Sequence, residues 1–449
     1  MNTYDVIVVG AGYSGLSAAR LLKSSGKKVL VLEARDRVGG RVHTRHLEDG
    51  QYIDLGAQWI GPTQSRMYDL LREFNIPAFK THDEGRTVFH WEGKIKTYKG
   101  LIPPLPVPAL LSLNNAIKKM NRLSRSIDPS CPWAAKQASY WDSITLQGWM
   151  DRQMMSSKAK QLFSLASQAI FAAHPAEVSM LFALFYTRSG RDFETLMNIR
   201  HGAQDERILG GADLPARKIA ELLAEEIRLS MPVRSIEQSS DGVTVRCSDS
   251  VFRGSKVILA IPPPMLSRID FITPVSAARK QLWQRMPMGA VWKCYAIYPE
   301  PFWRKKGLNG IVASDNGYTR VVFDNSPYDG GRGILMGFVL ADEARALSKL
   351  NEKERREAIL GSFVKYYGKE AADPLLYTDQ TWVEEEWSHG CYTAFMGPHT
   401  MTSLGSILRA SEGHLHFAGT ETAEEWNGYM EGAVRAGERE ARCIIGLQA

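Results

Sequence analysis

The chain has 449 residues, of which 44% are hydrophobic and 23% are charged, and its formal net charge is +6. These proportions are those of an ordinary globular protein, and they exclude collagen, a coiled coil and bulk disorder. The positive balance is small for the length and no long Lys/Arg block occurs, so nucleic-acid binding is not expected.

The first forty residues carry a dinucleotide-binding pattern. A β-branched run over 4–9 precedes Gly10, Gly12 and Gly15, apolar residues then recur at helical spacing, and a second strand ends at Glu33. The glycines permit a tight turn and let a pyrophosphate approach the backbone, while the N-terminus of the helix attracts its negative charge. Glu33 stands where an acid accepts hydrogen bonds from ribose hydroxyls. The sequence therefore predicts a dinucleotide site here.

The residues after this acid favour a flavin over a nicotinamide dinucleotide. Arg35 is followed by Gly39-Gly40, a second bare backbone turn, and by Arg41, whose guanidinium suits a phosphate or a flavin carbonyl. Simple nicotinamide-binding domains do not need this element. The stretch 54–61 is rich in glycine and aromatic residues, as expected where a backbone passes close to a flat ring.

The rest of the chain alternates predicted helices and strands, without an internal repeat or a low-complexity linker. In chain order, the patterns predict helices over 149–169, 179–187 and 214–226, strands over 235–236, 243–247 and 256–261, a helix over 352–367, a strand from residue 414 and a final helix over 428–445.

On the glycine pattern and on residues 33–41, the chain resembles the flavin amine oxidase family, and the monoamine oxidases in particular. The resemblance covers essentially the whole chain and implies an α/β fold, in which a Rossmann-like FAD-binding domain is interleaved with a substrate domain of mixed sheet plus helices. It implies an FAD-binding domain over 1–79, 208–282 and 385–449 and a substrate domain over 80–207 and 283–384. Interleaving also explains why no linker is visible.

Cys391 lies in the segment Ser388–Thr393, where monoamine oxidases carry the cysteine that forms a thioether to the 8α-methyl carbon of the flavin. The resemblance therefore implies covalent FAD; the alternative is an unlinked thiol beside the ring, because linkage needs a reachable thiolate. The other four cysteines are scattered, with no CxxC and no Cys/His cluster, so neither a disulfide framework nor a structural zinc site is expected. This usage favours a reducing, cytoplasmic location.

Two tyrosines and a lysine are the catalytic residues that the resemblance implies. Tyr392 and Tyr429 match aromatic walls that face each other before the flavin, and such a cage removes water from an amine and by this desolvation disfavours its ammonium form. Lys293, in an otherwise apolar strand, matches the lysine that contacts flavin N5 through a water and assists the reaction with oxygen. Gln204 matches a glutamine of the same pocket, and a residue of a surface loop is the alternative reading.

The resemblance assigns further residues to the site. The cofactor contacts, beside those already named, are Gly56, Ala57, Gln58, Trp59, Val233, Trp382, Gly419, Thr420, Glu421, Gly428 and Met430. The substrate-pocket residues are Met197, Ala169, Ile170 and Val321, whose mostly apolar character indicates an aromatic or alkyl amine. No metal site is expected.

Together these residues predict an FAD-dependent oxidase that converts a primary amine, with O2 and water, to an aldehyde, ammonia and H2O2. A polyamine oxidase or an L-amino-acid oxidase on the same scaffold is the alternative. The first would need acidic residues along its entrance and the second an arginine that binds the substrate carboxylate, and neither is evident in the sequence. A flavin-binding interaction protein without oxidase turnover is the distant alternative. The expected partners of this soluble protein are a small amine and O2, with no membrane anchor and with a homodimer left open.

Overall fold

The computed structural model describes residues 3–100 and 102–447. Its N-terminal part forms the predicted strand, glycine turn, helix and strand, as β1 (Thr3–Val9), α1 (Tyr13–Ser24) and β2 (Val29–Leu32). The two strands run parallel, and every residue of β2 is buried, which is typical of a parallel strand covered on both faces. The predicted α/β class with a Rossmann-like unit is confirmed.

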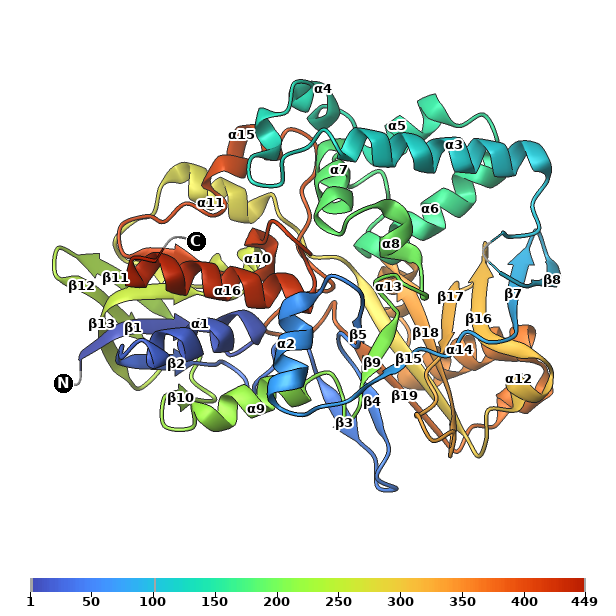
Figure 1. Cartoon of the computed structure of the whole chain (residues 1–449), viewed down its shortest axis with the longest axis horizontal. Coiled ribbons are helices and arrows are strands. Elements are labelled where there is room, and N and C mark those ends of the chain that lie inside the picture. Colours follow the sequence, from blue (N-terminus) through green and yellow to red (C-terminus); the bar gives the residue numbers. More distant parts are fainter. Residues whose placement is uncertain (1–2, 101, 448–449) are drawn as a thin grey trace.

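Over the described residues, an eight-stranded sheet is built around this unit. β1 lies between β2 and β13 (Val251–Leu259), and β20 (Leu415–Phe417) pairs with β13. α16 (Met430–Ile445) runs alongside α1 (Figure 1), and a Cβ on Gly437 would lie 2.0 Å from the carbonyl oxygen of Ser14, so only glycine allows this approach. The remaining strands are β10 (Ile227–Arg228), β11 (Ser235–Ser239), β12 (Gly242–Arg246) and β14 (Asp270–Phe271).

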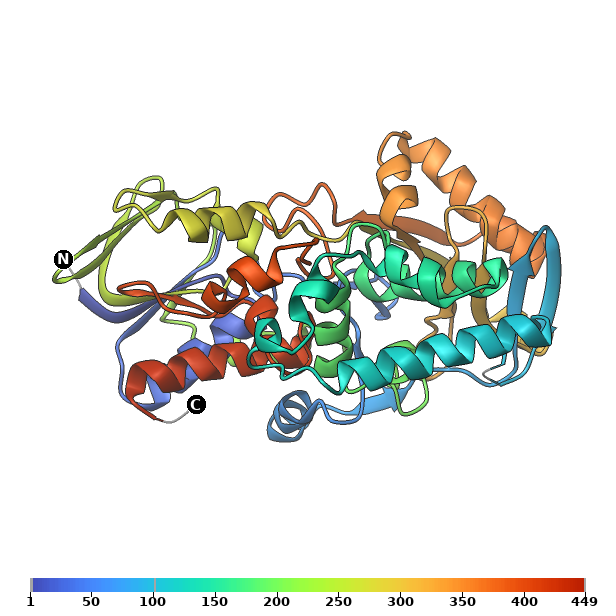
Figure 2. The ribbon, with the colours of Figure 1, turned by 90° about the horizontal axis from the view of Figure 1, so that it is seen from above.

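A second sheet, of seven strands among the residues described, forms the other half of the molecule, and Figure 2 shows the two halves side by side. β15 (Val291–Tyr298) pairs antiparallel with β18 (Gly333–Leu340), and every residue of both strands is buried. α14 (Glu352–Tyr367) has the bounds that the sequence predicts and shares a hydrophobic core with this sheet. The other strands are β7 (Arg86–Trp91), β8 (Lys94–Tyr98), β16 (Leu308–Ser314), β17 (Val321–Asp324) and β19 (Leu376–Thr381).

A cluster of helices lies beside the second sheet, at the top of Figure 1, and it buries a core of its own. The single helical pattern predicted over 149–169 is wrong, because the chain breaks at 154–156. There the side chain of Ser156 accepts a hydrogen bond from the N–H of Ala159 and caps a new helix. The helices are α3 (Val107–Ser124), α4 (Ala138–Asp142), α5 (Leu146–Gln153), α6 (Ser157–Phe171), α7 (Met180–Ser189) and α8 (Phe193–Met197).

The strands of the eight-stranded sheet all lie within 1–79, 208–282 and 385–449, and those of the seven-stranded sheet within 80–207 and 283–384. Two smaller sheets complete the strand set: β3 (Thr44–His46) pairs with β4 (Tyr52–Asp54), and β9 (Glu206–Ile208) pairs with β5 (Trp59–Ile60) and β6 (Ala78–Lys80).

Shorter helices complete the fold. The predicted helix over 214–226 ends early, as α9 (Leu214–Leu222), because the next residues form the turn into β10. No helix in the described part of the chain combines the length and the apolar character needed to cross a bilayer. The other helices are α2 (Ser65–Glu73), α10 (Pro263–Leu266), α11 (Ala277–Gln284), α12 (Phe302–Lys305), α13 (Ala341–Leu347) and α15 (Met401–Leu404).

Candidate active site

One cavity of about 1210 Å³ extends from the glycine turn after β1 to the face of the second sheet. Its lining includes Gly10 and Glu33 from the first sheet, Lys293 and Val321 from the second, and Ile170 from the helical cluster. Ligand cavities commonly measure about 300–1,000 Å³, so this volume has room for more than one small molecule. The cavity joins both halves of the protein in a single site.

The glycine end of the cavity has the shape of a dinucleotide cradle. Gly10 has a φ of +100°, and a Cβ there would lie 2.8 Å from the carbonyl oxygen of Ala260, so the turn requires glycine. A Cβ on Gly12 would meet no protein atom closer than 3.8 Å, which means that the missing side chain leaves its space to the cavity. Gly12 is also the N-cap of α1 and has no side-chain cap, so the helix offers free N–H groups to an anion.

The carboxylate of Glu33 is held rigidly beside this turn. It accepts hydrogen bonds from the N–H of Ala11 at 2.6 Å and from the N–H of Arg35 at 3.0 Å, and only 3% of the residue is exposed. The guanidinium of Arg35 is bonded in turn to both oxygens of Glu385, at 2.9 and 2.6 Å. The donor groups, the cradle and the fixed acid together fit the FAD that the sequence predicts.

Arg41 lines the middle of the cavity, and its guanidinium is fixed by protein acceptors. It donates to Glu421 at 2.6 Å and to the carbonyl oxygen of Tyr392 at 2.9 Å. Burial would raise the pKa of the Glu421 carboxyl, but the attraction of Arg41 outweighs it, and the pKa lies below its usual range. The carboxylate is therefore charged, and it anchors Arg41 from behind the cavity wall.

Lys293 reaches the cavity from β15 and is almost fully buried. Its side-chain nitrogen donates to the carbonyl oxygens of Asp54 and Gly56, at 2.6 and 2.8 Å, and to the amide oxygen of Gln58 at 2.6 Å. Burial lowers the pKa of the Lys293 ammonium to about 7, although the nearby Asp54 carboxylate raises it in part. A lysine with this pKa exchanges its proton near neutral pH, which is unusual for the residue.

Cys391 lies in the wall of the same cavity, on the loop that precedes Tyr392. It is 5% exposed, and its N–H donates to the carbonyl oxygen of Gly289 at 3.0 Å. Burial raises the pKa of the Cys391 thiol to about 12, and the Arg41 guanidinium opposes that shift. The thiol is therefore protonated at neutral pH, unlike the exposed, electropositive thiols that react readily with solutes.

Aromatic and apolar side chains line the chamber between Lys293 and the helical cluster. Phe338 packs edge-on against Tyr392, with ring centroids 5.9 Å apart, and Tyr186 lies 6.2 Å from Tyr429. Burial raises the pKa of both Tyr392 and Tyr429, so that their hydroxyls are neutral. The sequence analysis missed Tyr186 and Phe338, because an apolar helix or strand does not reveal which side chains face a cavity.

The mouth of the chamber carries charged residues that the sequence analysis also missed. Arg200 binds both carboxylate oxygens of Asp83, at 2.6 and 2.9 Å, and thereby joins the loop before β9 to the loop before β7. Glu84 and Lys99 are exposed and line the cavity beside this pair. The positive charge of Arg200 and the negative charge of Asp83 therefore neutralise each other through a direct ion pair at the mouth.

The structure brings nearly all of the predicted site residues to this one cavity. Two predicted cofactor residues, Gly15 and Glu421, are not in the described lining of the cavity. Gly15 has a packing role instead: a Cβ there would lie 1.9 Å from the carbonyl oxygen of Gly10, so glycine lets α1 pack against the turn. Gln204 lines the cavity and its amide nitrogen donates to the carbonyl oxygen of Leu196. The other predicted residues in the lining are Gly10, Gly12, Glu33, Arg35, Gly39, Gly40, Arg41, Gly56, Ala57, Gln58, Trp59, Ala169, Ile170, Met197, Val233, Lys293, Val321, Trp382, Cys391, Tyr392, Gly419, Thr420, Gly428, Tyr429 and Met430.

Comparison with known proteins gives one consistent result. The family model described as flavin containing amine oxidoreductase matches residues 13–445. The flavin-containing amine oxidase of Oncorhynchus mykiss is 40% identical over 99% of this chain and 86% of its own length, and the B form of Homo sapiens is 38% identical over the same shares. The solved structure of a putrescine oxidase bound to putrescine is 32% identical, with a TM-score of 0.96 and 99% of each chain covered.

Proposed function

Since this chain belongs to the family of flavin-containing amine oxidoreductases, we propose that it oxidises primary aromatic or alkyl monoamines with O2. Water is the second co-reactant, because it hydrolyses the imine, and the products are the aldehyde, ammonia and H2O2. The observation that carries the proposal is the single cavity, which joins a dinucleotide cradle to an apolar chamber containing Lys293 and two tyrosines. An oxidase needs both parts in contact, because hydride must pass directly from substrate to flavin.

The residues of the cradle would hold the FAD. Gly12 and the N-terminus of α1 suit the pyrophosphate, Glu33 suits the ribose hydroxyls, and the free N-terminus of α16 at Met430 suits the pyrimidine side of the flavin. The bound flavin supplies the acceptor for the hydride of the amine α-carbon. In agreement with this, the acidic residues of the described lining are Glu33 at the cradle and Asp83 and Glu84 on the loop before β7.

Cys391 is the residue that we assign to a covalent thioether with the 8α-methyl carbon of the flavin. Its support is its position in the cavity wall next to Tyr392 and the match to the linking cysteine of monoamine oxidases. The Arg41 guanidinium favours the thiolate that such a bond requires, even though burial of the free thiol opposes it.

Tyr392 and Tyr429 would bind the amine and remove its water. Both are partly exposed to the cavity, and neutral phenol rings next to apolar walls favour the uncharged amine over the ammonium ion. Only the uncharged amine has a nitrogen lone pair. This lone pair donates electrons toward the adjacent carbon and so makes the loss of hydride from that carbon easier. The tyrosines therefore act by desolvation and orientation, and no carboxylate base is required.

Lys293 would hold a proton close to where oxygen is reduced. Its amine is fixed by three acceptors, and its pKa of about 7 lets it carry a positive charge in part of the population at neutral pH. A fixed cation stabilises negative charge that develops on oxygen, and the surrounding low dielectric strengthens this effect. We accordingly assign Lys293 to the step that regenerates the enzyme.

A diamine is the second candidate substrate, and the acids at the mouth favour it. A distal ammonium group would find Asp83 and Glu84 there, but Asp83 is already neutralised by Arg200. The same pair argues against an amino acid as substrate, because the Arg200 guanidinium that could bind its carboxylate is occupied. The chamber itself is lined by apolar side chains such as Leu165 and Phe323, which favours a monoamine.

We further propose that the two large sheets define two domains, with the FAD-binding domain over 1–79, 208–282 and 385–449 and the substrate domain over 80–207 and 283–384. The strand content of each sheet supports this division. All five cysteines are free, which supports a location in the reducing cytoplasm.

The experiment that tests the function is a peroxide assay on the purified, flavin-loaded protein. We expect H2O2 and aldehyde from tyramine, phenethylamine or benzylamine, with lower kcat/KM for putrescine. Putrescine as the best substrate would replace the monoamine proposal by the diamine one. A lack of peroxide from every amine tested would refute oxidase function.

A further inference from the structure

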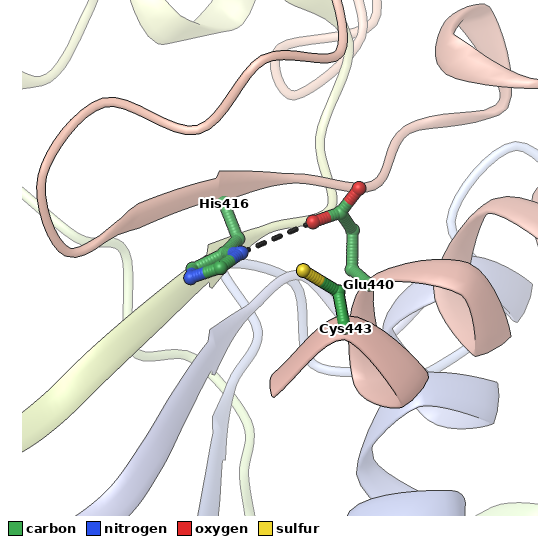
Figure 3. A group of neighbouring side chains, drawn as sticks. All are labelled: His416, Glu440 and Cys443. Carbon is green, nitrogen blue, oxygen red and sulfur yellow. Dashed lines mark hydrogen bonds and ion pairs between the residues drawn. The ribbon is translucent and has the colours of Figure 1, made fainter. Parts of the chain in front are cut away.

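His416, Glu440 and Cys443 come together near the C-terminal end of α16 (Figure 3), whereas Met430 and Ala433 of the cavity lining lie at its N-terminal end. His416 lies on β20, and Glu440 and Cys443 are three residues apart on α16, which places both on one face of the helix. One potential ligand atom from each side chain lies within 4.8 Å of the other two. We propose that this cluster is a binding site for one Zn²⁺ ion, independent of the oxidase reaction.

The histidine and the glutamate already have the spacing of two zinc ligands. Nδ1 of His416 lies 3.1 Å from Oε2 of Glu440. Two ligand atoms about 2.1 Å from a tetrahedral zinc ion are about 3.4 Å apart, so the pair opens only slightly to admit the ion. The two metal–ligand bonds would take the place of the hydrogen bond between these atoms.

The thiol of Cys443 points toward this pair (Figure 3), and Cys443 is exposed whereas the other two residues are buried. The ion therefore has access from the side of the cysteine. The sulfur lies within 4.8 Å of the other two ligand atoms, so it would have to move closer to bind zinc, and its proton would be released when the bond forms. A water would complete the tetrahedron, and a mixed set of nitrogen, oxygen and sulfur suits zinc better than Mg²⁺ or Ca²⁺.

Neighbouring groups orient the ligands of the cluster, although one of them, the Arg439 guanidinium 2.8 Å from Oε1 of Glu440, is itself a cation. Oε1 of Glu440 accepts a hydrogen bond of 2.9 Å from Arg439, which orients the carboxylate and leaves Oε2 for the ion. The C-terminal end of α16 carries the negative end of the helix dipole. Nε2 of His416 has no hydrogen-bond partner, so the ring proton can reside there when Nδ1 binds the ion.

The sequence analysis expected no metal site, because the chain has no CxxC motif and no Cys/His cluster. The site depends on the packing of α16 beside β20, and no spacing in the sequence reports that packing. Zinc would cross-link this helix to the sheet that carries the FAD cradle. Its expected effect is on stability and not on the chemistry of the cavity.

The test is zinc binding by the purified, flavin-loaded protein, measured by competition with a chelator, for three proteins. Cys443→Ser removes the sulfur without touching the His416–Glu440 pair. Cys131→Ser is the matched control, because Cys131 and Cys443 are the two cysteines that are not buried. We expect one Zn²⁺ per chain in the parent protein and in the control, and an affinity at least about tenfold lower in Cys443→Ser.

Two further readouts separate thiol ligation from adventitious binding. Co²⁺ in place of Zn²⁺ should give a thiolate charge-transfer band in the parent protein that Cys443→Ser lacks. Saturating Zn²⁺ should raise the melting temperature of the parent and of Cys131→Ser but not of Cys443→Ser, because an ion that binds only the folded state stabilises it. Equal zinc affinity in the parent and Cys443→Ser, or no binding by either, would overturn the proposal. Loss of oxidase activity plays no part in this test.

Discussion

The side-chain nitrogen of Lys293 donates a hydrogen bond of 2.6 Å to the backbone carbonyl of Asp54. Lys293 belongs to the second sheet and Asp54 ends β4, so the bond joins the two halves of the protein at the wall of the cavity. Gly56 and Gln58 accept from the same nitrogen. A buried amine that is held at three points stays at one place relative to the bound flavin, which is the condition for a fixed proton carrier.

Replacing Lys293 with methionine should slow reoxidation of the flavin by O2 by about 100-fold, the usual cost of losing one electrostatic contact in a buried site. Reduction of the flavin by amine should change by less than about threefold, because the substrate tyrosines are untouched. Stopped-flow measurement of the two half-reactions checks this. Lys99→Met is the control, since Lys99 lines the mouth but is exposed. Equal slowing of both half-reactions would contradict the assigned role.

The rate of reoxidation should also depend on pH through Lys293. Its pKa is lowered by burial to about 7, so the ammonium is charged below that pH and neutral above it. Because a positive charge favours electron transfer to O2, the rate constant should be highest below pH 7 and should fall as the pH rises through about 7. Lys293→Met should give a flat profile over the same range. A parent profile without an inflection near pH 7 would show that another group controls this step.

Replacing Cys391 with serine should release the flavin on acid precipitation, whereas the parent protein should keep its yellow colour in the pellet. The reason is that the thioether is the only proposed covalent bond between protein and cofactor. Cys131→Ser is the matched control and should behave as the parent. If the parent itself releases its flavin to the supernatant, the linkage through Cys391 is refuted, while non-covalent binding of FAD is unaffected.

Replacing Arg200 with glutamine should improve the use of diamines. The substitution leaves the Asp83 carboxylate unpaired at the mouth, where it attracts a distal ammonium group. We expect the ratio of kcat/KM for putrescine to that for phenethylamine to rise about two- to fivefold, the size typical of one exposed charge. The effect should shrink at high salt. Asp83→Asn should move the ratio in the opposite direction, and a shift of the same sign in both variants would contradict this explanation.

Replacing Glu421 with glutamine should destabilise the protein. The change leaves the positive charge of Arg41 without its buried partner, and breaking such a pair costs about 3 kcal/mol. Thermal unfolding followed by flavin fluorescence should show that the flavin becomes exposed to water at a lower temperature than in the parent protein, because Arg41 lines the cavity. Glu424→Gln is the control: Glu424 also pairs with an arginine, Arg409, but its side chain is 44% exposed. Equal effects of the two substitutions would argue against a special role for the Arg41 pair.

The sequence predicted those parts of the site that depend on neighbouring residues in the chain. The glycine turn and Glu33 follow from local spacing, and their geometry agrees with that prediction. Lys293 and Tyr392 came from resemblance to a family, and both line the cavity, but their chemical roles are still predictions. Membership of the amine oxidase family is confirmed over nearly the whole chain.

Features that depend on packing between distant segments could not be predicted. The ion pair of Asp83 with Arg200 joins two loops whose contact no periodicity reports, and Tyr186 looks like any residue of an apolar helix. The break between α5 and α6 was missed for a different reason. Ser156 caps a helix where the apolar spacing alone continues, so capping chemistry prevailed over periodicity.

The order of strands in the first sheet has a consequence for biosynthesis. Val8 pairs with Ile258, and Ile258 pairs with His416, so the sheet draws on segments made early, midway and late. Until residues 415–445 have been translated, the nascent chain lacks β20 and α16, and with them Tyr429 and Met430 of the cavity wall. Contacts between such distant segments form slowly. Capture of the flavin therefore follows the synthesis of β20 and α16, and a translation product that stops before β20 would have an open cradle.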